Sequence, residues 1–226
     1  MPPILYAFDV SPFKEEDLFS AALRAISPER KAKADRLLSP EKKMLSVGAA
    51  LLLDYALGKS GEKAPFAIRL GENGKPFLEN GKTHFSLSHS GKWAICAVSE
   101  HEIGCDVEKI AEANLLLAKR FFTEKESAEI LSRQTEEERN ALFFRYWTLK
   151  ESFQKATGLG FALPMKSFEI EPGERISLTQ SVDRRQYCFR EYPDLSGYAC
   201  SVCAEGETPF HSLRFVTVTE LLPEKA

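Results

Sequence analysis

The middle of the chain carries three short segments with the β-branched and alternating character of strands. They cover residues 84–88, 93–99 and 103–107, and only Glu100-His101-Glu102 separates the last two. Connections this short join antiparallel strands, because a parallel pair needs a crossover of a dozen or more residues. The sequence therefore predicts antiparallel sheet at the centre of the chain.

Helices and strands alternate on both sides of this centre. Apolar spacing predicts helices over 15–26, 39–57, 115–131 and 136–157, and a further helix that starts at Ser27. Ser27-Pro28 and Ser39-Pro40 have the sequence of helix N-caps. Further strands are expected at 4–10, 66–70, 77–78, 167–171, 175–178, 186–191, 199–204 and 213–218. We expect an α+β fold of two halves, residues 1–102 and 103–226, although no sequence repeat or flexible linker marks the division.

Composition narrows the class of protein. The 226 residues carry a net charge of −3, which disfavours a nucleic-acid partner. No apolar run approaches the roughly 18 to 20 residues of a membrane helix, and the first residues meet Asp9 too early for a signal peptide. An odd number of cysteines, five, favours free thiols. We expect a cytoplasmic protein with no membrane partner.

Basic residues are concentrated between Arg30 and Lys43. This stretch holds six basic and two acidic side chains, among them Arg30 and Lys33. One interpretation is a solvated helix face, and the other is a seat for the phosphates of a small ligand. Composition does not separate the two.

Asp106 and Glu108 lie two residues apart on a predicted strand, so both carboxylates point to the same face. Adjacent carboxylates repel each other unless a cation lies between them. Hard oxygen donors in this arrangement suit Mg²⁺, which keeps its other positions for water and substrate phosphates. A solvent-facing acidic pair is the alternative.

The helix predicted over 136–157 carries Glu151 and Lys155 on one face, opposite its apolar stripe. Phe144 and Trp147 share that face, which is unusual for a purely solvated surface. The pair therefore lines a partly apolar cleft in one interpretation and is a simple i,i+4 surface pair in the other.

Ser88 and His89 lie at the end of a predicted strand, between further serines and Gly91. An imidazole and hydroxyls in this position can face a phosphate, whereas a structural histidine is the alternative. Adjacent strand residues point to opposite faces, which disfavours a direct serine–histidine catalytic pair.

These stretches resemble, in order and separation, the motifs of the Sfp-type 4′-phosphopantetheinyl transferases. The matching segments are Gly74-Lys75-Pro76, Phe85-Ser86-Leu87-Ser88-His89-Ser90, Ile103-Gly104-Cys105-Asp106-Val107-Glu108, Ala118-Lys119-Arg120-Phe121-Phe122 and Trp147-Thr148-Leu149-Lys150-Glu151-Ser152-Phe153-Gln154-Lys155. The resemblance extends from Ser27 to about residue 205. It implies two similar α+β halves related by a pseudo-twofold axis, with the active site in the cleft between them.

The resemblance also implies an activity and a set of site residues. The enzyme would transfer 4′-phosphopantetheine from coenzyme A to a serine of an apo acyl, peptidyl or aryl carrier protein, releasing 3′,5′-ADP. By motif match, the Mg²⁺ ligands are Asp106, Glu108 and Glu151, and the coenzyme A-binding residues are Arg30, Lys33, Lys75, Ser88, His89, Lys150 and Lys155. Glu151 is a candidate general base, and Lys155 a candidate for stabilising or protonating the leaving phosphate.

One position departs from the family pattern. Met44 occupies the place of an arginine that binds the 3′-phosphate, and Lys42 or Lys43 is a poorer clamp for that phosphate. The carrier protein, being acidic, is expected to dock near Lys119, Arg120 and Phe121-Phe122. The cleft needs no second subunit, so we expect a monomer.

Two other functions use the same residues. A Mg²⁺-dependent nucleotide pyrophosphatase would use the carboxylates and lysines with water as the nucleophile. A catalytically silent module that binds carrier proteins is a third hypothesis, which the intact set of Asp106, Glu108, Glu151 and Lys155 disfavours.

Overall fold

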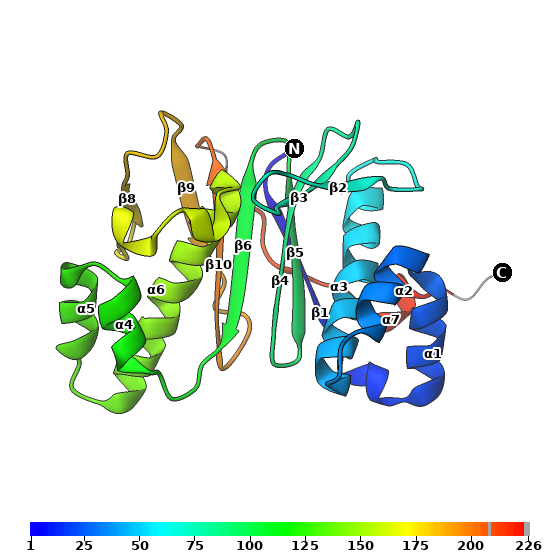
Figure 1. Ribbon diagram of the computed structural model, residues 1–226, viewed down its shortest axis with the longest axis horizontal. Helices are drawn as coiled ribbons and strands as arrows, with labels where there is room; N and C mark the ends of the chain where they lie inside the picture. Colours follow the sequence, from blue (N-terminus) through cyan, green and yellow to red (C-terminus); the bar gives the residue numbers. More distant parts are fainter. Residues whose placement is uncertain (208, 224–226) are drawn as a thin grey trace.

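The fold consists of two antiparallel-based sheets set side by side, with helices on both outer sides (Figure 1). It was obtained as a computed structural model that describes residues 1–207 and 209–223. Two small hairpins complete the strand content of these residues. The predicted α+β class is confirmed.

The first sheet has the strand order β11-β1-β5-β4. Its strands are β1 (Ile4–Asp9), β4 (His84–Ser90), β5 (Trp93–Ser99) and β11 (Arg214–Phe215). β5 runs antiparallel to both β1 and β4, with Ser88 opposite Ile95, whereas β11 runs parallel to β1. The sequence prediction of antiparallel pairing is correct for β4 and β5.

The second sheet has the order β6-β10-β9 and is antiparallel throughout. Its strands are β6 (Ile103–Lys109), β9 (Tyr187–Glu191) and β10 (Tyr198–Glu205). The hairpins are β2 (Ile68–Leu70) with β3 (Pro76–Leu78), and β7 (Glu169–Glu171) with β8 (Ser177–Thr179). β6 lies alongside β4, so the two sheets meet along these strands.

Seven α-helices occur in the described part of the chain. They are α1 (Glu16–Ala25), α2 (Pro28–Asp35), α3 (Pro40–Lys59), α4 (Leu115–Phe121), α5 (Glu124–Leu131), α6 (Glu136–Thr157) and α7 (Val218–Leu221). Three short 3₁₀ turns cover Ser11–Lys14, Gly160–Ala162 and Met165–Ser167. The Ser27 and Ser39 side chains accept bonds from the backbone N–H three residues on, as expected of N-caps.

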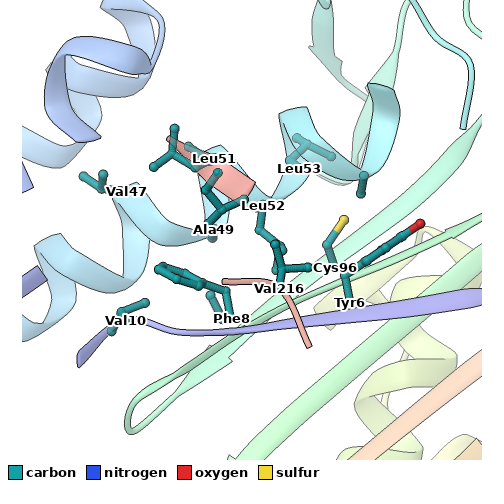
Figure 2. Packing of buried hydrophobic residues seen from close by; sticks show 14 of the residues in the cluster. Tyr6, Phe8, Val10, Val47, Ala49, Leu51, Leu52, Leu53, Cys96 and Val216 are labelled. Carbon is teal, nitrogen blue, oxygen red and sulfur yellow. The ribbon is translucent and has the colours of Figure 1, made fainter. Parts of the chain in front are cut away.

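The core is divided by the sheets into layers. One layer packs α3 on the first sheet, and Figure 2 shows Leu52 of α3 above Phe8, Cys96 and Val216. A second layer fills the space between the sheets, and a third packs α6 on the second sheet. An aromatic cluster joins α4 and α5 to α6. α1, α2, α3 and α7 thus lie on one outer side of the molecule, and α4, α5 and α6 on the other (Figure 1).

Three local expectations differ from the structure. The helix predicted over 115–131 is two helices, because Thr123 forms a capping box with Glu126 and starts α5. The short connection at 100–102 does not close a hairpin, since it carries the chain from β5 of one sheet to β6 of the other. The segment expected to be a strand over 213–218 is a two-residue strand followed by the start of α7.

The end of the described chain also qualifies the predicted division at residue 102. β11 pairs with β1, and Leu221 of α7 belongs to the core around α3. The segment from Arg214 to Leu221 is therefore packed on the first half, although the prediction assigned it to the second.

None of the helices in the described part of the chain has the length and apolar character of a membrane-spanning segment.

Candidate active site

Asp106 and Glu108 lie on β6 where this strand meets α6. The alternate residues Ile103, Cys105 and Val107 face the core between the sheets, which turns the two carboxylates to the α6 side. Gly104 lets the helix approach closely, because a Cβ atom there would be 2.0 Å from the carbonyl oxygen of Ser152. The strand alternation predicted from sequence thus aims both carboxylates at α6.

Lys155 of α6 is the centre of the charged cluster. Its Nζ lies 2.6 Å from Oδ1 of Asp106 and 3.4 Å from Oε2 of Glu151. It also donates to the hydroxyl of Ser88, 3.3 Å away. Although burial lowers its pKa, the charges of Asp106 and Glu151 more than offset this and raise the pKa above the ordinary value. Lys155 is therefore a permanent ammonium between two carboxylates.

Asp106 is almost completely buried and keeps one oxygen without a partner. Oδ1 accepts from Ser88 at 2.6 Å and from Lys155, whereas Oδ2 has no hydrogen-bond partner within the described residues. A buried, unpaired carboxylate oxygen is costly, and it marks a place where a missing cation or donor fits.

The three carboxylates do not yet form a ready metal site. No group of three or more His, Cys, Asp or Glu side chains in residues 1–207 and 209–223 is arranged to hold an ion. Asp106 and Glu151 instead share Lys155, and Glu108 is held from the other sheet by Ser90 at 2.7 Å. The donors are hard oxygens of the kind that Mg²⁺ prefers, so their chemistry fits such an ion.

Burial and mutual repulsion shift the pKa values of two of these carboxyls. Burial and then the charge of Asp106 raise the pKa of Glu151, against the opposing effects of Lys155 and a hydrogen bond from Trp147. Burial also raises the pKa of Glu108, with Asp106 and Glu151 adding to it and the Ser90 hydrogen bond opposing it. Shifted carboxyls grouped with a lysine are typical of functional sites.

Ser88 and His89 lie on opposite faces of β4, as their adjacency predicts. Ser88 faces Asp106, and His89 is exposed on the other face. Desolvation lowers the pKa of His89, and the charges of Lys155 and Lys33 lower it further. The charge of Lys33 thus reaches His89, which brings the start of the basic cluster within electrostatic range of the site.

The Lys75 side chain, which the family resemblance assigns to coenzyme A binding, contacts protein groups outside the cluster around Lys155. Its ammonium donates to Oε2 of Glu102 at 2.5 Å and to the carbonyl oxygens of Ile103 and Ala156 at 3.1 and 3.2 Å. These three bonds use all of its protons. Burial lowers the pKa of Lys75, with Glu102 opposing the shift. Lys75 therefore ties the β2–β3 hairpin to the start of β6 and the end of α6.

Lys150 is likewise not part of the cluster. Its side chain is 0% exposed, and Nζ lies 2.8 Å from Glu126 and from the carbonyl oxygens of Met165 and Phe168. Burial lowers its pKa, against the charge of Glu126. All three donors are thus used by Glu126 and two backbone carbonyl groups, whereas the contact of Lys150 with a pyrophosphate stays a prediction.

Two functional contacts were not predicted from the sequence. Ser90 holds Glu108, and Trp147 hydrogen-bonds Glu151 four residues further along α6. The alternating serines 86, 88 and 90 are the signal for the first, because they give one face of β4 a row of hydroxyls. The second follows from the i,i+4 spacing on one helix.

Carboxylates, a lysine and hydroxyls gathered where the two sheets meet form a charged site of the kind that binds phosphate esters together with a divalent ion. The fold and site thus define a group-transfer enzyme or hydrolase acting on a phosphate compound.

Comparison with known proteins decides the family. The 4′-phosphopantetheinyl transferase superfamily matches residues 102–203. A 4′-phosphopantetheinyl transferase of Bacillus subtilis is 32% identical over 92% of this chain and 93% of its own. The 4′-phosphopantetheinyl transferase gsp of Aneurinibacillus migulanus is 34% identical over 68% of this chain and 63% of its own.

A solved structure of a holo-(acyl-carrier-protein) synthase from Bacillus anthracis, in complex with CoA (3′,5′-ADP), is 19% identical in sequence to this chain. The match covers 47% of this chain and 96% of the synthase chain, with a TM-score of 0.39. The sequence relatives show that the chain belongs to the 4′-phosphopantetheinyl transferase superfamily. It transfers 4′-phosphopantetheine from coenzyme A to carrier proteins.

Proposed function

We propose that the cluster around Lys155 is the place where the diphosphate of coenzyme A and a Mg²⁺ ion bind. Asp106, Glu108 and Glu151 are the residues that would hold the ion. The observation that supports this most is Oδ2 of Asp106, which is buried and has no hydrogen-bond partner among the described residues. Buried polar atoms are normally paired, and a bound cation would supply the partner. Lys155 already joins Asp106 and Glu151, so these two carboxylates are close to each other.

The residues of the chain have separable roles in this proposal. Bound Mg²⁺ would supply charge neutralisation on the diphosphate. Glu151, whose pKa is raised by burial, accepts the proton of the attacking serine hydroxyl. Lys155 remains cationic and offsets the charge that develops on the departing 3′,5′-ADP. Positioning of the hydroxyl against the phosphorus supplies the rest.

Coenzyme A is proposed to lie in the cleft between the two halves, which we propose to be related by a pseudo-twofold axis. Arg30 and Lys33 would bind its 3′-phosphate together with His89, and the effect of Lys33 on the pKa of His89 supports this. Lys43 is held by Asp35 at 2.7 Å, and Met44 packs against the apolar core. Lys42, which is exposed, is therefore the proposed substitute for the arginine of the family pattern.

The carrier protein is proposed to dock on α4. Lys119 and Arg120 are exposed there, and Leu116 is 74% exposed beside a hollow of about 600 Å³ that Lys119 also lines. This surface offers positive charge and apolar contact to an acidic helical partner. Phe122 is buried and Phe121 packs edge-on against Trp147, so these two support the surface from below.

Substitution of the proposed base tests the assignment. We expect Glu151→Gln to lower kcat by at least about 100-fold at saturating Mg²⁺, while the Kd of coenzyme A changes far less. Steady-state transfer to an apo carrier and equilibrium titration of coenzyme A measure the two quantities. Glu137→Gln, an exposed change on the same helix, is the control. Wild-type kcat in Glu151→Gln would reject the role.

A further inference from the structure

The joint between the two sheets is built from serine hydroxyls. β4 and β6 lie side by side but belong to different sheets. Across this joint, Oγ of Ser86 accepts the backbone N–H of Cys105 at 3.0 Å, and Oγ of Ser90 accepts the N–H of Lys109 at 3.1 Å. The side chains thus satisfy backbone donors that a strand partner would otherwise satisfy.

The same row of hydroxyls reaches the carboxylates. Ser88 donates to Oδ1 of Asp106 at 2.6 Å, and Ser90 donates to Oε2 of Glu108 at 2.7 Å. A hydroxyl has one proton, so the two bonds of Ser90 fix its proton on Glu108 and its lone pair on Lys109. Glu108 is therefore held by a group that is itself anchored to the backbone of β6.

Ser86 differs from Ser90 in one respect. It makes the same kind of contact with the backbone of β6, and the Cys105 thiol donates to its backbone carbonyl oxygen, but its hydroxyl makes no hydrogen bond to a carboxylate among the described residues. The chain thus offers an internal comparison between a serine that only joins the sheets and one that joins them and also holds a carboxylate.

We propose that Ser90 is a positioning residue, which orients Glu108 across the joint toward the divalent ion of the reaction. The inference rests on the proposed metal site. It places one ligand under the control of the opposite half, so that correct joining of the halves and correct presentation of Glu108 are one event. Groups that hydrogen-bond a metal ligand commonly affect metal affinity about 10- to 100-fold.

The test is the affinity of the full-length protein for Mn²⁺, measured by electron paramagnetic resonance of the free ion with coenzyme A present. We expect Ser90→Ala to raise the Kd of Mn²⁺ about tenfold. Ser90→Thr, which keeps the hydroxyl, should restore the wild-type Kd, and Ser86→Ala should leave it unchanged. Ser90→Cys, with a weaker donor of similar size, gives an intermediate Kd and serves if the alanine variant does not fold.

Three results overturn the inference. A wild-type Kd in folded Ser90→Ala or Ser90→Cys would show that Glu108 needs no such support. An equal loss of affinity in Ser86→Ala would assign the effect to loosening of the joint. If the wild-type protein itself binds no Mn²⁺ with coenzyme A present, the proposed metal site fails. This result differs from failure of the Ser90 role alone, in which the wild type still binds Mn²⁺.

Discussion

Two lysines five residues apart on α6, Lys150 and Lys155, have different surroundings. Both lie in a stretch that the sequence assigned to the substrate pyrophosphate. Lys155 keeps 29% of its side chain exposed and joins Asp106 and Glu151, whereas Lys150 is enclosed with Glu126 in the second half. Helical geometry places positions 150 and 155 on different faces, since five residues turn the helix by about 500°. The burial of Lys150 depends on the loop after α6, which no periodicity in the helix itself specifies.

The buried pair gives a prediction about Lys150. Lys150→Met leaves the 1% exposed Glu126 without its ionic partner, although the N–H groups of Thr123 and Ile170 still donate to it, so we expect a loss of about 3 kcal/mol in the free energy of unfolding. The double variant with Glu126→Gln should recover a large part of this loss, because it removes the orphaned charge. Chemical denaturation of the three variants measures the coupling.

The Kd of coenzyme A distinguishes this role from substrate binding. We expect the folded double variant to bind coenzyme A as the wild type does. A stable Lys150→Met protein with greatly weakened coenzyme A binding would show instead that Lys150 contacts the substrate.

At the scale of elements, the site depends on how closely α6 approaches β6. α6 itself could be predicted from sequence over its full length, because Thr135 and Glu138 form a capping box and Gly158 ends the helix with φ of 74°. The alternation of β6 predicted the common direction of Asp106 and Glu108. The distance between the two elements could not be predicted, since it depends on the absence of a side chain at Gly104.

Gly104→Ala tests this approach. The new methyl group would overlap backbone atoms of α6 at Ser152 and Ala156. Helix backbone atoms cannot move aside as the end of a flexible side chain can. We expect a loss of stability of about 1–3 kcal/mol or more and a fall in transfer activity beyond that explained by unfolding. Thermal unfolding and transfer kinetics at low temperature measure the two effects.

Gly58→Ala is the matched control for this change. Gly58 lies inside α3 with no atom within 4 Å of a built Cβ. Alanine there should stabilise the protein by up to about 1 kcal/mol and leave the activity unchanged. Unaltered stability and activity in Gly104→Ala would contradict the account of the close approach.

At the scale of the whole molecule, the two sheets and their flanking elements are connected at several places by side chains and by one strand pairing. The serines of β4 join the sheets, Lys75 ties the β2–β3 hairpin to β6 and α6, and the chain returns to the first sheet at β11. None of these connections could be predicted from local pattern, because each pairs residues far apart in sequence. The tight connection at 100–102 is the point where the chain changes sheets, at the position where the sequence analysis divided the chain.

The Lys75–Glu102 contact predicts a pH dependence of stability. Burial alone would raise the pKa of Glu102. The hydrogen bond from His84 and the charge of Lys75 more than offset this effect and lower the pKa to about 2, from an ordinary 4.5. A lowered pKa in the folded state contributes stability that is present above pH 4.5 and is lost as the pH falls toward 2. The wild-type free energy of unfolding should therefore fall on acidification in this window.

Glu102→Gln removes this proton uptake. We expect the variant to be less stable at neutral pH and to lose less stability between pH 5 and 3, by up to about 1.4 kcal/mol per pH unit. Urea denaturation across that range measures the slopes, with exposed Glu112→Gln as the control. Parallel slopes for wild type and Glu102→Gln would be evidence against the contact in solution.

Intact-mass spectrometry of an apo carrier protein, after incubation with coenzyme A and Mg²⁺, tests the central claim most directly. The wild type should add one phosphopantetheine to a carrier serine and leave coenzyme A intact when no carrier is present. Folded Asp106→Asn should add little or none, because an uncharged amide then replaces the buried carboxylate at the joint. Hydrolysis of coenzyme A without carrier, or transfer by Asp106→Asn at the wild-type rate, would contradict the account.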